Sequence, residues 1–105
     1  MSEVEDKTQA LLARLWLQNR PIIEERLATL ERASAAAGAG RLPEDLRREA
    51  HSTAHKLAGA VGMYGYDEGT RIARELELLL SGASLDAGRF NSLVGELRAS
   101  LFPNG

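Results

Sequence analysis

The sequence predicts an all-α domain: an antiparallel, up-and-down four-helix bundle with an additional N-terminal helix that caps one end. Two observations predict it. Apolar residues recur at helical spacing along nearly the whole chain, and no stretch alternates apolar and polar residues as a half-buried strand does. The segments between the helical patterns hold only about two to five residues, which favours antiparallel neighbours. We expect residues 1–105 to form a single domain, because a chain of this length buries one core.

The composition argues against several classes of protein. A net charge of −2 does not suit binding to nucleic acid through neutralised phosphates. The chain contains no cysteine, so it has no disulfide or thiolate chemistry, and its apolar runs are far shorter than the ~20 residues that span a bilayer. We therefore expect a cytoplasmic protein, or a soluble module of a larger one, with no nucleic-acid or membrane partner.

The first two predicted helices are separated by a proline. A weak capping box at Ser2 to Glu5 begins the first, and Pro21 predicts a break, because proline lacks the backbone donor and its ring clashes with the preceding turn. Proline fits the first turn of a new helix, so the second begins there and ends at residues 38–40. Trp16 belongs either to the cap or to a solvent-exposed dimer or docking surface, and we expect a monomer.

Three further helices follow. Residues 42–45 place a proline and two acids where a helix N-terminus favours them, so a third helix begins here. It ends near Gly65, a candidate left-handed C-cap. Asp67 can cap the fourth helix, which Ser81-Gly82 closes, and the last begins at Ser84 or Asp86.

The third helix has two dissimilar faces. Its predicted core face contains Leu46, Ala50, Thr53, Leu57, Ala60, Val61 and Tyr64. The opposite face, around His55, contains Arg48, His51, Ala58, Gly59 and Gly62. A glycine inside a helix costs roughly 1 kcal/mol relative to alanine, so two on one stripe indicate a close approach of something else. That neighbour is either another helix of the bundle or a binding partner, and both interpretations can hold together.

The residues from Ala54 to Gly65, AHKLAGAVGMYG, together with DEGTRIARELE from Asp67 to Glu77, carry a family likeness. They resemble the histidine-containing phosphotransfer (HPt) domains of bacterial multistep phosphorelays. In that family the accepting histidine is followed by a leucine, a glycine and a second glycine, and a later helix ends in a Leu-Glu pair. The matching residues here are His55, Leu57, Gly59, Gly65 and Leu76-Glu77.

The resemblance implies that His55 accepts a phosphoryl group from the aspartate of a response-regulator receiver domain, or donates it back, in two-component signal transduction. A neutral imidazole nitrogen is a competent nucleophile for this step. The domain would be a carrier without a cofactor of its own, because the partner receiver or hybrid histidine kinase brings the active site and Mg²⁺. The alternative is a helical module that binds a receiver or kinase without phosphotransfer.

The receiver is expected to dock on the small-residue face. The predicted contacts are Arg48, His51, Ser52, Lys56, Ala58, Gly59, Gly62 and Met63. We interpret His51 as a surface residue beside the docking site rather than a second acceptor. His51 and His55 could hold a metal only with a third ligand, and the glutamate of the HExxH pattern is missing, so we predict no metal site.

Two positions depart from the HPt pattern. The family usually has a lysine beside the phosphoryl group, and Ala58 stands there instead. We expect another cation to take that role, and hypothesise an arginine. The candidates are Lys56, Arg48, Arg71 and Arg74. Gly69 replaces a bulky apolar residue, a volume that we expect Tyr64 or Tyr66 to fill.

Overall fold

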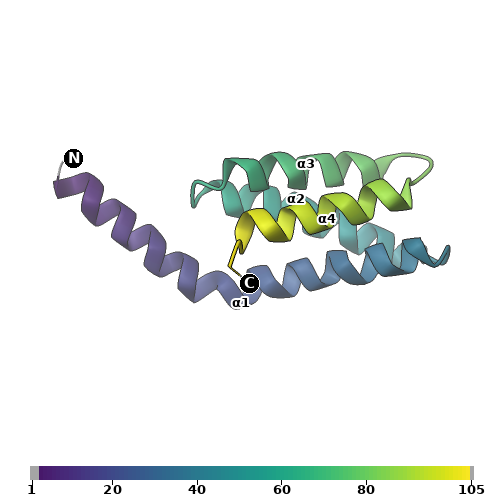
Figure 1. Cartoon of the computed structure of the whole chain (residues 1–105), viewed down its shortest axis with the longest axis horizontal. Helices are drawn as coiled ribbons and strands as arrows, with labels where there is room; N and C mark the ends of the chain where they lie inside the picture. The colour runs from purple at the N-terminus through teal and green to yellow at the C-terminus, as the bar shows by residue number, and fades with distance from the viewer. Residues whose placement is uncertain (1–2, 105) are drawn as a thin grey trace.

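The computed structural model describes residues 3–104, which form four α-helices (Figure 1). Their bounds are Glu3–Gly38 for α1, Glu44–Gly62 for α2, Asp67–Ser81 for α3 and Ala87–Leu101 for α4. Helices α1 and α3 each contact both α2 and α4, so α2, α3, α4 and the C-terminal part of α1 enclose one core. The predicted all-α four-helix bundle is confirmed.

The predicted helix break at Pro21 is wrong. Helix α1 passes through Pro21 as one helix of 36 residues. An internal proline removes one backbone hydrogen bond and pushes on the preceding turn, which bends a helix without ending it when packing supports both sides. Figure 1 shows α1 bent in its middle, with its N-terminal part leaning away from the bundle instead of lying across the end as a separate capping helix. The predicted capping box at Ser2 lies outside the described residues.

Trp16 attaches the leaning part of α1 to the end of the bundle. Its ring centroid lies 5.3 Å from that of Tyr64, 4.6 Å from that of Tyr66 and 5.7 Å from that of Phe102. Next to this aromatic cluster, the Asn19 side-chain amide donates a hydrogen bond to the Tyr64 hydroxyl oxygen at 3.0 Å. Aromatic contacts of this kind add to the free energy of burial. They hold α1 in place on the N-terminal side of the proline.

Replacing Trp16 by alanine is expected to lower the free energy of unfolding by about 2–3 kcal/mol, because a large half-buried ring is lost from the cluster. Urea unfolding followed by circular dichroism measures this change. Leu17→Ala is the matched control: Leu17 is the next residue of α1 and is 66% exposed. It should change stability by no more than about 0.5 kcal/mol. Equal losses in the two variants would show that Trp16 is not the anchor.

The core consists almost entirely of aliphatic side chains at helical spacing on the inner faces of the four helices. The largest fully buried side chains are those of Ile23, Leu27, Leu30, Leu57, Val61, Ile72, Leu76, Phe90, Leu93, Leu97 and Leu101.

No helix within residues 3–104 has both the length and the apolar character needed to cross a membrane.

The helix ends largely follow the predicted signals. Gly65 has a φ of +83°, the left-handed conformation predicted for it, although α2 itself ends three residues earlier, at Gly62. Gly40, after α1, has a φ of +73°. At the start of α4 the Asp86 carboxylate accepts a hydrogen bond from the backbone N–H of Arg89 at 3.0 Å, so Asp86 is the N-cap.

Gly69 allows α3 and α4 to approach closely. A Cβ atom at this buried position would lie 3.0 Å from Cδ2 of Leu101 and 3.5 Å from Cβ of Tyr66. Leu101 therefore lies nearest to the volume that we expected a tyrosine to fill. Of the two tyrosines, Tyr66 also lies beside this position, through its Cβ, and Tyr64 packs against Trp16.

Candidate functional site

His55 lies near the middle of α2, on the outer side of the bundle. The helix that carries it begins after Pro43, with Glu44 and Asp45 in the first turn, where carboxylates interact favourably with the helix dipole. The core side of the same helix is anchored by fully buried residues such as Leu57. The His55 side chain itself is 73% exposed. The ring is therefore held by a rigid element and remains accessible from solvent.

Glu77 of α3 fixes the orientation of that ring. Its Oε2 atom lies 2.6 Å from Nδ1 of His55, and the Glu77 side chain is only 25% exposed. When the imidazole is neutral, a carboxylate in this position selects the tautomer in which Nδ1 carries the proton and donates it to Oε2. Nε2 then keeps its lone pair. Glu77 thus leaves the outer nitrogen free to act as a nucleophile.

The hairpin of α2 and α3 brings these two residues together. The connection at residues 63–66 turns the chain back, so α3 lies antiparallel to α2, and the hydroxyl of Thr70 donates a 3.4 Å hydrogen bond to the carbonyl of Ala58. In the sequence, Glu77 stood out only as part of the Leu76-Glu77 pair, with no role for its carboxylate at the site. A signal was present, because residues equally far from a turn meet in an antiparallel pair, and Glu77 lies about as far after the turn as His55 lies before it.

Part of the small-residue stripe packs against α3. Ala58, predicted to contact the receiver, is only 7% exposed, so it offers little surface to a partner. Ala54 is also buried, and a Cβ atom at Gly62 would lie 3.1 Å from the hydroxyl of Thr70. Small side chains at four-residue intervals let two helices approach closely. At Ala58 and Gly62, therefore, the interpretation as close helix packing holds.

Gly59 differs from Gly62. It is exposed, and a Cβ atom there would have nothing within 4 Å apart from its own helix. No neighbouring helix requires glycine at this position, although it lies one turn after His55. The missing side chain instead lowers the surface beside the ring.

We expect Gly59→Ala to raise the free energy of unfolding by about 1 kcal/mol, because alanine restores helix propensity and meets no neighbour. Gly62→Ala is the matched control on the same helix and should gain less, since its Cβ must displace the Thr70 hydroxyl. Urea unfolding of both variants measures the difference. An equal or larger gain for Gly62→Ala would contradict the assignment of close packing to Gly62.

The four candidate cations are not equivalent. Arg71 binds the carboxylates of Glu68 and Glu75 on its own helix. Its hydrogen bond with Glu68 raises the pKa of Arg71 above the ordinary value and lowers the pKa of Glu68. The charge of Arg71 is thus already balanced by two acids.

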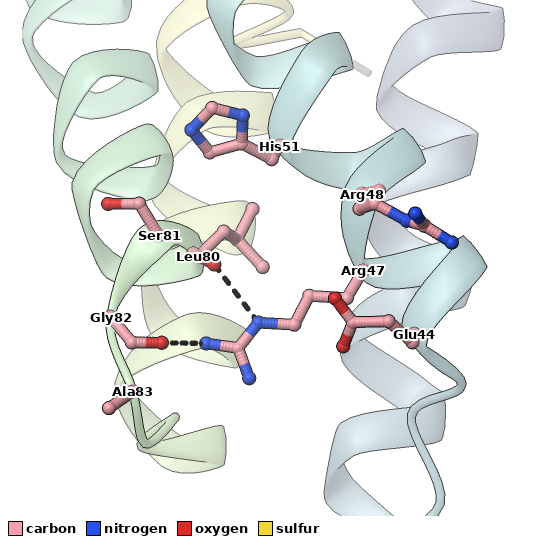
Figure 2. Close-up of a pocket in the computed structure, with 8 residues that line it drawn as sticks. All are labelled: Glu44, Arg47, Arg48, His51, Leu80, Ser81, Gly82 and Ala83. Atoms are coloured by element: carbon pink, nitrogen blue, oxygen red, sulfur yellow. Dashed lines mark hydrogen bonds between the residues drawn. The ribbon is translucent and has the colours of Figure 1, made fainter.

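The other three cations, Arg48, Lys56 and Arg74, are exposed, and none makes an ion pair with another residue between 3 and 104. Arg48 precedes His55 by two turns of α2, roughly 10 Å along the helix axis. Figure 2 shows the Arg48 side chain pointing away from α3. Lys56 lies about 100° around α2 from His55, and Arg74 lies on α3, one turn before Glu77.

His51 has surroundings quite different from those of His55. It is half-buried and lines a polar pocket of about 410 Å³ between the start of α2 and the end of α3 (Figure 2). Arg47 lines this pocket and donates hydrogen bonds to the carbonyls of Leu80, at 3.0 Å, and Gly82. Within residues 3–104 no group of three His, Cys, Asp or Glu side chains could hold a metal ion.

Of the remaining predicted docking residues, Ser52 is exposed and Met63 is 70% exposed. Met63 also lines an apolar groove of about 780 Å³ between the α2–α3 turn and the leaning part of α1, where Leu12 and Trp16 form the other wall. Met63 and Gly62 are thus the predicted docking residues that line this groove.

A comparison with protein families adds an independent observation: the model of the Hpt domain family matches residues 21–101, which is most of the chain. The chain belongs to the Hpt domain family. Hpt domains are phosphocarrier modules that serve histidine phosphotransfer in phosphorelays and interact with receiver domains and kinases. The match begins at Pro21, so the leaning part of α1 lies outside it. Neither the curated proteins nor the solved structures that were compared gave a match.

Proposed function

We propose that this Hpt domain carries a phosphoryl group on Nε2 of His55 and exchanges it with the aspartate of a response-regulator receiver domain in a two-component phosphorelay. The observation that supports this proposal is the His55–Glu77 pair. Its 2.6 Å contact occupies Nδ1, while the ring remains 73% exposed. An ordinary surface histidine has no need of a partly buried carboxylate that fixes its tautomer.

In the forward step the Nε2 lone pair attacks the phosphorus atom of the aspartyl phosphate. An N–P bond forms, the P–O bond to the aspartate breaks, and its electron pair returns to the carboxylate. The proton on Nδ1 stays in the hydrogen bond to Glu77. The product imidazole therefore carries a positive charge next to the Glu77 carboxylate, which stabilises the charge. The reverse step runs through the same positions.

The receiver is expected to dock over His55 and Gly59, with Ser52, Lys56 and Met63 at the edges of the contact, because these residues are exposed on one side of α2. Mg²⁺ bound to the receiver would supply charge stabilisation to the transferring group. This chain needs no cofactor of its own in the proposed reaction. We also propose that it acts as a monomer in the cytoplasm, which suits a chain without cysteine.

Incubation with a receiver domain carrying radiolabelled aspartyl phosphate tests the proposal. The label should move to the Hpt domain, and it should be labile in acid and stable in base, as a phosphoryl group on nitrogen is. Fragmentation mass spectrometry should place it on His55 and not on His51. Binding of the receiver without transfer of label would instead support the alternative, an interaction module that keeps the fold without the chemistry.

A further inference from the structure

We propose that Arg74 of α3 supplies the cation that binds the phosphoryl group on His55, in place of the lysine that the family usually has where this chain has Ala58. This inference rests on the proposed phosphoryl transfer to His55. It selects one of several positively charged residues near the ring, and it assigns the phosphoryl contact to the helix opposite the one that carries the histidine.

The register of the two helices places Arg74 within about one helical turn of the site. Glu77 meets His55 at 2.6 Å, and Thr70 meets Ala58 at 3.4 Å. Arg74 lies between Thr70 and Glu77 on α3, so it stands opposite the segment of α2 that connects His55 and Ala58. That segment is where a lysine at the position of Ala58 would begin.

Arg74 also lies at the solvent-exposed edge of the α2–α3 contact. Thr70 and Glu77, seven residues apart, share the side of α3 that faces α2, and Arg74 is within about 60° of that side. The preceding residue, Ala73, is fully buried, whereas Arg74 is exposed. Arg74 is therefore on the solvent side of the contact, where the His55 ring also emerges.

The short side chain of Ala58 leaves room for the guanidinium. Ala58 is 7% exposed, and its side chain ends at Cβ, so it does not itself occupy the place of a longer side chain. Arg74 precedes Glu77 by three residues, so it needs to cover about 4.5 Å along the axis to come level with the residue that meets His55. A guanidinium presents several donors in one plane and binds phosphate oxygens in pairs, and it stays charged at every relevant pH.

The rival cations are placed less well. Arg71 is held by Glu68 and Glu75 and lies a further turn away from Glu77. Arg48 is separated from His55 by roughly 10 Å along α2. Lys56 lies on the flank of α2 away from α3, because His55 and Ala58 both face α3 and Lys56 is about 100° around the helix from His55.

The test uses the full chain with His55 phosphorylated by phosphoramidate, which requires no receiver. Phosphorus NMR then gives the pKa of the bound phosphoryl group. A neighbouring cation favours the dianion and lowers this pKa, so Arg74→Ala should raise it by roughly half a unit. Arg74→Ala should also shift the exchange equilibrium with a phosphorylated receiver about threefold to tenfold toward the receiver. Arg74→Lys should restore most of both effects.

Lys56→Ala and Arg71→Ala are the controls, and each should leave the phosphoryl pKa unchanged. Ala58→Lys in the Arg74→Ala background should restore the lower pKa, because it supplies the missing lysine. An unchanged pKa in Arg74→Ala, or a larger shift in Lys56→Ala, would overturn the assignment of Arg74 alone. Failure of His55 to take up phosphate from both phosphoramidate and a receiver would overturn the proposed function with it.

Discussion

The His55→Gln variant is expected to accept no label from a phosphorylated receiver domain, a complete loss of phosphotransfer. Glutamine has a similar length but no nucleophilic nitrogen, since the lone pair of its amide nitrogen is delocalised into the carbonyl. The fold should remain, because His55 is 73% exposed and its single described hydrogen bond goes to Glu77. Unfolding in urea should show a change of less than about 1 kcal/mol.

His51→Gln is the matched control, since it makes the same replacement one turn earlier on the same helix. His51 lines the polar pocket, and no carboxylate among residues 3–104 pairs with its ring. This variant should accept label at nearly the wild-type rate. Transfer to the His55→Gln variant, or loss of transfer in the His51→Gln variant with intact receiver binding, would show that the acceptor has been assigned to the wrong histidine.

Removal of the Glu77 carboxylate is expected to have the second largest effect. Glu77→Ala should slow phosphotransfer by about tenfold to hundredfold, because the tautomer of His55 is no longer fixed and no anion stabilises the imidazolium that forms. Glu77→Gln should lie between Glu77→Ala and the wild type, since an amide oxygen still accepts the Nδ1 proton but carries no charge. Quenched-flow transfer at saturating receiver measures these rates.

Glu75→Gln is the control for Glu77. Glu75 is on the same helix, but it pairs with Arg71 and Arg89 rather than with His55. Its replacement should leave the transfer rate unchanged. Nitrogen NMR of the imidazole gives a second measurement: proton occupancy should move from Nδ1 toward Nε2 in Glu77→Ala only. Wild-type rates and an unchanged tautomer in Glu77→Ala would remove Glu77 from the mechanism.

The variants of Glu77 and Arg74 examine different parts of the same transfer. Glu77 acts on the imidazole, so its loss should change the rate and the tautomer. Arg74 acts on the phosphoryl group, so its loss should change the phosphoryl pKa and the exchange equilibrium. A double variant should therefore show both changes, and the two residues should be separable by these measurements.

Local patterns in the sequence determined much of this protein. The helical spacing of apolar residues predicted the bundle, and the identity of Gly65 predicted its left-handed conformation, at a φ of +83°. The helical spacing also predicted an outward His55. These features depend on the chemistry of one residue or on the angle between residues of one helix, and neither requires knowledge of a second helix.

Only the tertiary structure decided how the helices meet. Periodicity gives the direction in which a side chain points about the axis of its own helix. It does not say which neighbouring helix lies in that direction, or which residue of that helix comes opposite. The burial of Ala58, the pairing of His55 with Glu77 and the place of Arg74 all follow from the register and rotation of α3 against α2. That register is set by the packing of apolar faces from all four helices at once. In the same way, Trp16 packs against the end of the bundle and holds α1 together across Pro21, where local propensity favours a break.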